Sequence, residues 1–145
     1  MSKNIMFNSE GYFDPTAGAA LSKIIKRESE AKRMKFAYIA SAYNAHGTVT
    51  TVENIDRARE YCRIAVDRGY CPMCPHIFLT QILSDDIPAE RALGLQLGLK
   101  MLKRCEELWV FTRNGYISEG MQGEIAAAEN RNMIIRYFDF KDEEG

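Results

Sequence analysis

Apolar residues recur along the chain in two alternating patterns. Four segments carry them at intervals of three and four residues, which is the spacing of an amphipathic helix. Four shorter runs are almost continuously apolar, which is typical of strands buried on both faces. The predicted helices are 14–33, 51–69, 87–106 and 119–132. The predicted strands are 35–43, 70–75, 107–112 and 133–140.

Local signals support the ends of two of these helices. Asp14 is a candidate N-cap, and Pro15 after it suits the first helical position. Gly69 is a natural C-terminal stop for the second helix. Trp109 in the third strand is expected in the core. The apolar residues of the second helix that we expect to face inward are Ile55, Ala58, Tyr61, Cys62, Ala65 and Val66.

Strands that alternate with helices imply right-handed crossovers and a parallel sheet covered on both faces. We therefore predict a single-domain α/β protein, a Rossmann- or flavodoxin-like three-layer sandwich with four to five strands and an extra N-terminal helix. The expected divisions are 1–33 for the N-terminal extension and helix, 34–140 for the α/β domain and 141–145 for an acidic tail.

Composition and charge exclude some classes of function. The 145 residues are enough for one domain with a real core, and 19 basic against 20 acidic residues give a net charge of -1. This balance argues against a partner that is a nucleic-acid polymer, although a small anionic ligand stays open. We see no targeting pattern and no apolar run near the roughly 20 residues of a membrane helix. A cytoplasmic protein without a membrane partner is therefore expected.

The spacing of the cysteines favours free thiols over a metal site or a redox motif. Cys71 and Cys74 form a CxxC motif with His76 nearby, but a zinc site needs four ligands, and no second pair stands at suitable spacing. A redox motif would open a helix, whereas Pro75 follows this pair directly. Free cysteines on a buried strand are the preferred interpretation, and no metal is expected.

In open parallel sheets, ligands bind beyond the carboxyl ends of the strands. The polar segments that follow the first three strands are 41–44, 75–81 and 113–124, and we expect them to converge. In the third, Ser118 and Gly120 lead into a helix whose free N–H groups can hold an anion, and Glu124 faces the same cavity. A nucleoside monophosphate, with its phosphate and its anomeric carbon on opposite sides of the sugar, fits such a layout.

Three stretches, "AYIASAYN", "ISEGMQGEIAAA" and "IIRYF", resemble the nucleoside 2-deoxyribosyltransferase-like superfamily, over roughly residues 36–138. It includes the deoxynucleoside 5′-monophosphate N-glycosidases and related phage and bacterial proteins. The resemblance implies that Glu124, six residues after Ser118, is the nucleophile and that Ser118 helps to bind the 5′-phosphate. It also implies that Ser41 starts the site and that the protein is a homo-oligomer, a dimer or larger. No metal or organic cofactor is implied.

One position departs from the family pattern. The family usually carries an aspartate on the helix before the third strand, where this chain has Gly98. Asp85, Asp86 or Glu90 is expected to replace it, and we take Asp86 as the second catalytic candidate. The substrate-binding candidates are Ser41, Tyr43, Asn44, His76, Arg91, Ser118, Gly120 and Met121.

Structural interpretations of these residues stay open at this point. Ser118 suits a plain N-cap, and Glu124 a first-turn glutamate favoured by the helix dipole. Ser41 and Asn44 suit an ordinary turn. The remaining alternatives are packing for Tyr43, a structural role for His76 and pairing of Arg91 with Asp85 or Asp86.

Three functions follow in order of preference. The first is an enzyme, hydrolase or deoxyribosyltransferase, that acts on the N-glycosidic bond of a nucleoside or nucleoside 5′-monophosphate through Glu124. The second is a non-catalytic binder of a nucleotide-derived ligand, suggested by Gly98. The third is an interaction protein that uses its N-terminal helix.

Overall fold

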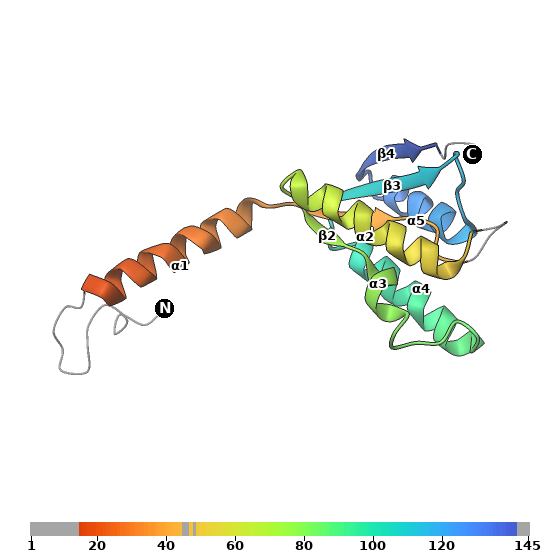
Figure 1. Ribbon diagram of the computed structural model, residues 1–145, viewed down its shortest axis with the longest axis horizontal. Coiled ribbons are helices and arrows are strands. Elements are labelled where there is room, and N and C mark those ends of the chain that lie inside the picture. Colours follow the sequence, from red (N-terminus) through yellow and green to blue (C-terminus); the bar gives the residue numbers. More distant parts are fainter. Residues whose placement is uncertain (1–14, 45–46, 48, 142–145) are drawn as a thin grey trace. The chain divides into compact units, whose positions relative to one another are not determined.

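Four parallel strands form the sheet of this protein, whose computed structural model describes residues 15–44, 47 and 49–141. The helices are α1 (Pro15–Arg33), α2 (Thr51–Asp67), α3 (Pro75–Leu79), α4 (Pro88–Leu102) and α5 (Glu119–Asn130). The strands are β1 (Phe36–Ala40), β2 (Cys71–Met73), β3 (Glu107–Arg113) and β4 (Ile134–Phe140). Apart from α3, the elements follow one another in the predicted alternation (Figure 1).

The chain divides into two units, residues 1–34 and 35–145. In the first unit, α1 begins at Pro15, and Asp14, the expected N-cap, lies outside the described residues. Along the apolar stripe of α1, Leu21 is buried, whereas Ile24 and Ile25 are exposed. None of the helices in the described part of the chain combines the length and the apolar character needed to cross a membrane.

The sheet of the second unit has the strand order β2-β1-β3-β4, with every neighbouring pair parallel. The chain leaves β1 toward β2 on one side and then crosses back to β3 on the other. The order therefore reverses between β1 and β3, which makes this the topological switch point. The predicted flavodoxin-like α/β fold is confirmed, with four strands.

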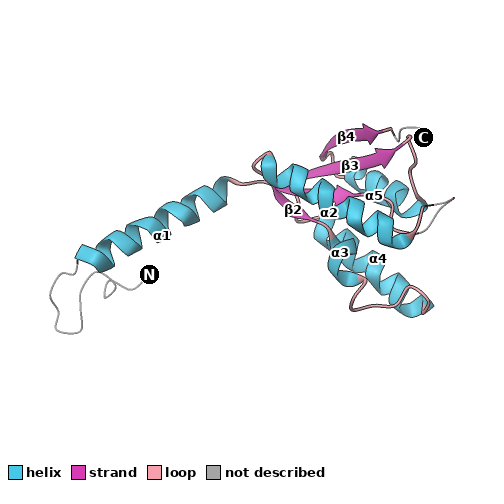
Figure 2. Ribbon diagram, in the orientation of Figure 1, coloured by secondary structure: helices cyan, strands magenta, loops and turns pink. Residues whose placement is uncertain are grey.

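Helices cover both faces of the sheet (Figure 2). Alternate residues of β1 and β3 enter two separate core clusters, because successive side chains of a strand point to opposite faces. On one face, Ala37, Ile39, Trp109 and Phe111 pack with Ala58, Tyr61 and Ala65 of α2. On the other face, Tyr38, Ala40, Leu108 and Val110 pack with Leu102 of α4 and with Met121 and Ala128 of α5. Trp109, expected in the core, is 1% exposed.

The structure corrects details of the sequence reading. The predicted strand 70–75 is only Cys71–Met73, and a short helix, α3, begins at Pro75. Five residues are too few to show a helical period, so the pattern missed this helix. Val66, expected inward, is 49% exposed, and the polar Asn54 is buried on α2 instead.

Candidate functional site

The segments that follow β1, β2 and β3 begin at the same edge of the sheet, because the strands are parallel. Ser41 directly follows β1, and His76 lies on α3 just after β2. Glu124 lies on α5 after β3. The rings of Tyr43 and His76 stack with their centres 5.6 Å apart, so the first two segments are in contact. The charge of Glu124 also helps to raise the pKa of the thiol of Cys74, which is the N-cap residue of α3.

Three buried polar atoms have no hydrogen-bond partner within the described part of the chain. They are Ser41 Oγ, His76 Nε2 and Glu124 Oε2, one from each of the three segments. Buried polar groups in folded proteins are almost always hydrogen-bonded, so each such atom needs an explanation. A bound ligand that reaches all three segments would supply the missing partners.

Two acidic residues are buried among the described residues, and they differ in how they are satisfied. Glu107, at the amino end of β3, accepts hydrogen bonds from Tyr70, Trp109 and Arg136. Glu124, at the opposite edge, is 8% exposed and interacts with the Tyr38 hydroxyl, and its Oε2 has no hydrogen-bond partner among the described residues. Burial raises the pKa of Glu124 from 4.5 to about 7, although the Tyr38 hydrogen bond lowers it. The Glu124 carboxyl group is therefore partly protonated at pH 7.

Helix α5 presents Glu124 inward for a simple local reason. Ser118 caps the helix, its Oγ accepting the Met121 N–H at 3.2 Å, so the capping role of Ser118 is seen directly. Met121, Glu124 and Ala128 then follow at helical spacing and are the buried residues of α5. Met121, a predicted substrate contact, belongs to the core cluster under the helix.

The glycines at the start of α5 border open space. A Cβ added at Gly120 or at Gly123 would meet no other heavy atom of the described chain within 4 Å. Gly120 lies one helical turn before Glu124, and side chains four residues apart are neighbours on a helix. Both glycines are exposed, whereas Glu124 is buried and lines neither of the cavities described below.

Gly98, which stands where the family aspartate was expected, lies against the same pair of residues. It is buried on α4, and a Cβ at this position would be 3.2 Å from the Tyr38 hydroxyl oxygen. This glycine leaves room for the hydroxyl that contacts Glu124. The position thus adjoins the Tyr38–Glu124 pair, even though it carries no carboxylate.

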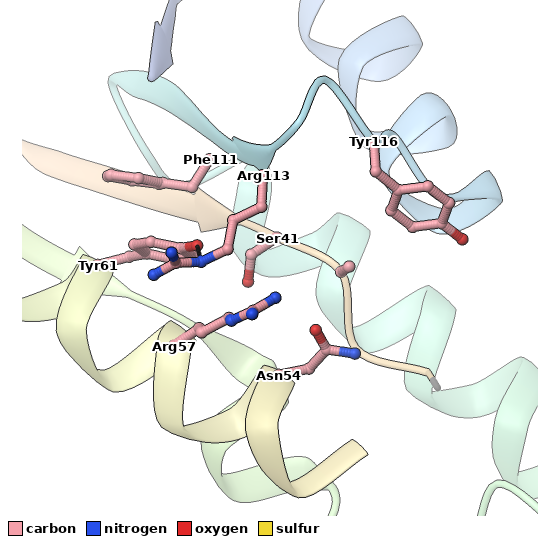
Figure 3. Close-up of a pocket in the computed structure, with 8 residues that line it drawn as sticks. Ser41, Asn54, Arg57, Tyr61, Phe111, Arg113 and Tyr116 are labelled. Carbon is pink, nitrogen blue, oxygen red and sulfur yellow. Dashed lines mark hydrogen bonds between the residues drawn. The ribbon is translucent and has the colours of Figure 1, made fainter. Parts of the chain in front are cut away.

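A small cavity of about 20 Å³ lies at the switch point (Figure 3). Arg113 at the end of β3 donates from Nε to the Tyr61 hydroxyl at 3.1 Å. Asn54 donates to the backbone oxygens of Tyr43 and Asn44 and so ties α2 to the segment after β1. The lining residues are Ser41, Ala42, Asn54, Arg57, Tyr61, Phe111, Arg113 and Tyr116.

Most of these lining residues were not predicted. Asn54, Arg57 and Tyr61 stand at positions i, i+3 and i+7 of α2, the spacing of a single helix face. Two polar residues on the face that also buries Ala58 were the available signal. The sequence reading treated that face as apolar and did not use them.

A second, wider cavity of about 570 Å³ is lined mainly by polar residues. Tyr43 and Asn44 line it from the segment after β1, and the predicted Asp86 lines it together with Asp85 and Glu90. Burial, followed by the charges of Asp85 and Asp86, raises the pKa of Tyr43. Burial lowers the pKa of His76 in spite of the nearby Asp85, so this imidazole is neutral at pH 7.

Two further predictions concern Arg91 and the cysteines. Arg91 is exposed on the first turn of α4 and lines neither cavity. The thiol of Cys74 contacts that of Cys62, and this contact together with burial raises the pKa of Cys74, so that it stays protonated. Among the described residues, no group of three His, Cys, Asp or Glu side chains is placed to hold a metal ion.

Comparison with known proteins shows the fold. No curated protein matches the sequence. The structure is similar to the 2-deoxyribosyltransferase of the psychrotolerant bacterium Bacillus psychrosaccharolyticus, with a TM-score of 0.59, 14% identity and 76% of each chain covered. It is also similar to the 2-desoxiribosyltransferase of Leishmania mexicana, with a TM-score of 0.52 and 14% identity, covering 72% of this chain and 64% of that one.

These likenesses show a 2-deoxyribosyltransferase-like fold. The sequence family is given by a separate match, which covers residues 35–138 and so takes in both cavities and Glu124. By that match the chain belongs to the family described as "Domain of unknown function (DUF7768)".

Proposed function

We propose that this protein cleaves or transfers the N-glycosidic bond of a nucleoside or nucleoside 5′-monophosphate, with Glu124 as the nucleophile. The observation that carries the proposal is the buried Glu124 carboxyl group, which interacts with the Tyr38 hydroxyl and whose Oε2 has no hydrogen-bond partner in the described chain. It lies at the carboxyl edge of a sheet whose fold is shared with 2-deoxyribosyltransferases.

The chemistry divides one displacement into two steps. The free carboxylate oxygen of Glu124 attacks the anomeric carbon, and the bond between that carbon and the base nitrogen breaks with its electron pair going to the base. The result is a glycosyl ester on Glu124, formed through an oxocarbenium-like transition state. Water then releases the sugar, or a second base takes it up.

Residues around Glu124 have distinct parts in this proposal. The Tyr38 hydroxyl would hold one carboxylate oxygen, and the other would attack the sugar. Asp86, in the second cavity, would orient the sugar or assist proton transfer to the leaving base, and Tyr43 and His76 would pack against that base. Ser118 and the open side of Gly120 would contact the ligand beside the carboxyl group.

Base release from a panel of nucleosides and deoxynucleoside 5′-monophosphates tests the proposal. Glu124→Ala is expected to abolish release, while calorimetry still detects ligand binding. The matched control is Glu119→Ala, which removes an exposed glutamate from the first turn of the same helix. Unchanged turnover in the Glu124 variant would show that the mechanism is wrong.

A second function is favoured by Gly98, which puts no carboxylate beside the Tyr38–Glu124 pair. In this alternative the protein binds a nucleotide-derived ligand without cleaving it. Tight binding of one compound from the panel, with no base released by the wild-type protein, would support it.

A further inference from the structure

The switch-point cavity gathers positive charge in a way that the proposed reaction does not use. Arg57 comes from α2 and Arg113 from the end of β3, and both line the cavity. Figure 3 shows the guanidinium group of Arg57 beside the Ser41 hydroxyl, whereas that of Arg113 lies over the Tyr61 ring at the wall of the cavity. Ser41 Oγ is one of the buried atoms that have no partner within the described residues.

Arg113 is held in place before any ligand arrives. Its Nε donates to Tyr61, and its guanidinium lies over the rings of Tyr61 and Phe140, at 5.9 and 5.5 Å from their centres. The side chain is 23% exposed, and its Nη2 is 3.6 Å from Glu60, whose own side chain is largely exposed. A guanidinium fixed in this way loses little freedom when it binds an acceptor, which favours affinity.

Arg57, on α2, affects the same tyrosine hydroxyl as Arg113, that of Tyr61. Both Arg57 and Arg113 lower the pKa of the Tyr61 hydroxyl, against the larger effect of burial, which raises it. Their positive charges therefore reach one point, the tyrosine oxygen at the wall of the cavity. None of the eight described residues that line the cavity is acidic.

The chemistry of the lining selects a phosphate group. Guanidinium groups bind phosphate through paired, charge-assisted hydrogen bonds, and hydroxyl groups add further donors. The cavity is small, with about 20 Å³ of free space, which is far below the range for whole-ligand pockets. The cavity thus suits one group of a ligand.

The second cavity indicates how the ligand is oriented. Ser41 and Ala42 line the switch-point cavity, and the next two residues, Tyr43 and Asn44, line the second. The two cavities therefore adjoin along one short segment. The second holds Asp85, Asp86 and Glu90, whose negative charges would repel a phosphate and accept hydrogen bonds from a base.

We infer that Arg57, Arg113 and Ser41 form a phosphate-binding subsite, which takes the phosphate of a nucleoside monophosphate whose base enters the second cavity. The identity of the ligand beyond its phosphate rests on the proposed function, whereas phosphate binding by the arginines does not. Ser118 then contacts the ligand beside Glu124 and not at its phosphate.

Calorimetry on the full chain tests the subsite in a Glu124→Gln background, which prevents turnover. Each deoxynucleoside 5′-monophosphate is compared with its nucleoside. Arg57→Gln and Arg113→Gln are each expected to weaken monophosphate binding by about tenfold or more, the effect of a lost hydrogen bond to a charged group. Nucleoside binding should change by less than about twofold, because the nucleoside does not fill this subsite.

The matched control is Arg63→Gln, which removes an arginine of α2 whose side chain is 75% exposed and pairs with Asp67 outside the cavity. It should leave both kinds of binding unchanged. Arg113 also packs on core rings, so circular dichroism must show that its variant is folded. Arg57→Gln is the decisive variant if it is not.

Inorganic phosphate provides a readout that is independent of nucleotides. Phosphate should raise the melting temperature of the parent protein and of Arg63→Gln, but not that of Arg57→Gln, compared with chloride at equal ionic strength. Equal weakening of nucleosides and monophosphates would overturn the inference, as would selective loss of monophosphate binding in Ser118→Ala alone. Intact phosphate binding in a protein that never releases a base would count against the proposed reaction only.

Discussion

Glu124 links the candidate reaction to the stability of the domain. Its carboxyl group has a pKa of about 7 in the folded protein, and its ordinary value is 4.5. Burial disfavours the charged form, so the folded state binds the proton more tightly than the unfolded state does. The protonated Glu124 carboxyl group therefore leaves the folded state at its full stability below pH 4.5. Its contribution to stability is lost as the pH rises through about 7, where the buried carboxyl group becomes charged.

We predict that Glu124→Gln is more stable than the wild-type protein at pH 8 and close to it at pH 4.5. A shift from 4.5 to about 7 corresponds to about 3 kcal/mol, since each pKa unit is worth about 1.4 kcal/mol. Denaturant unfolding of both proteins across this pH range measures the difference. Glu119→Gln is the control, and its difference from the wild type should stay small throughout. A Glu124 difference that does not grow with pH would contradict the assigned burial.

At the residue scale, sequence spacing identified some residues of the candidate site and missed others. Glu124 and Ser118 were chosen from their separation in the sequence, and Ser118 is seen to cap α5. Tyr38 was read as one apolar residue of a strand, yet its hydroxyl contacts Glu124. A tyrosine in a strand does not reveal what its hydroxyl meets, because the partner comes from a helix more than 80 residues away in the chain.

At the scale of elements, α4 contains two glycines that test the Tyr38–Glu124 contact. A Cβ at Gly94 would make an ordinary contact of 3.7 Å with Leu83, whereas at Gly98 it would come within 3.2 Å of the Tyr38 oxygen. Alanine in place of glycine inside a helix is worth about 0.5–1 kcal/mol where space allows.

We predict that Gly94→Ala raises the free energy of unfolding by about 0.5–1 kcal/mol and that Gly98→Ala does not. In Gly98→Ala the Tyr38 hydroxyl must move, which weakens its hydrogen bond to Glu124 and raises the pKa of that carboxyl group further. Denaturant unfolding measures the first effect, and NMR titration of the glutamate carboxyl carbons measures the second. Equal stabilisation by both substitutions, with an unchanged Glu124 titration, would show that Gly98 does not position Tyr38.

Helix α3 is the element that the sequence analysis did not predict. Pro75 was taken as evidence against a helix after Cys74, although proline suits the first position of a helix because its missing N–H is not needed there. The helix is short, and it carries His76 to the stacking contact with Tyr43. A structural detail of five residues thus decides where one of the three unpartnered atoms lies.

At the scale of the whole molecule, large apolar side chains are exposed on several elements, among them α1 and α4. Ile24 and Ile25 are exposed on α1, and Leu95 and Leu99 are exposed one turn apart on α4. Exposed apolar residues that gather on a helix face often mark an interface between proteins. Considered separately, each of these two faces is a candidate contact between copies of the chain.

We predict a homo-oligomer, at least a dimer. Light scattering should give at least twice the monomer mass of 16.5 kDa at micromolar concentration, and a mass near 16.5 kDa would refute the prediction. Replacing both Ile24 and Ile25 with Glu tests α1, and replacing both Leu95 and Leu99 with Glu tests α4. The pair that converts the assembly to folded monomer identifies the interface, and an unchanged mass for both pairs would place it elsewhere.

The order of elements and the class of fold were determined by the sequence itself. Apolar period and run length depend on neighbours along the chain, so α2, α4 and α5 and all four strands could be located within a few residues. The ends moved inward, as in β1, which is Phe36–Ala40 within the predicted 35–43. The parallel sheet followed from the alternation, and with it the edge at which to look for a site.

Only the tertiary structure decided which side chains meet at that edge. Arg57 and Arg113 are 56 positions apart in the chain and belong to a helix and a strand, yet they line one cavity. Three buried atoms without a hydrogen-bond partner in the described chain could also be identified only from the structure, because burial cannot be read from the sequence. They are Ser41 Oγ, His76 Nε2 and Glu124 Oε2. Local pattern reports the face on which a residue lies, whereas pairing, burial and pKa depend on distant segments that the fold brings together.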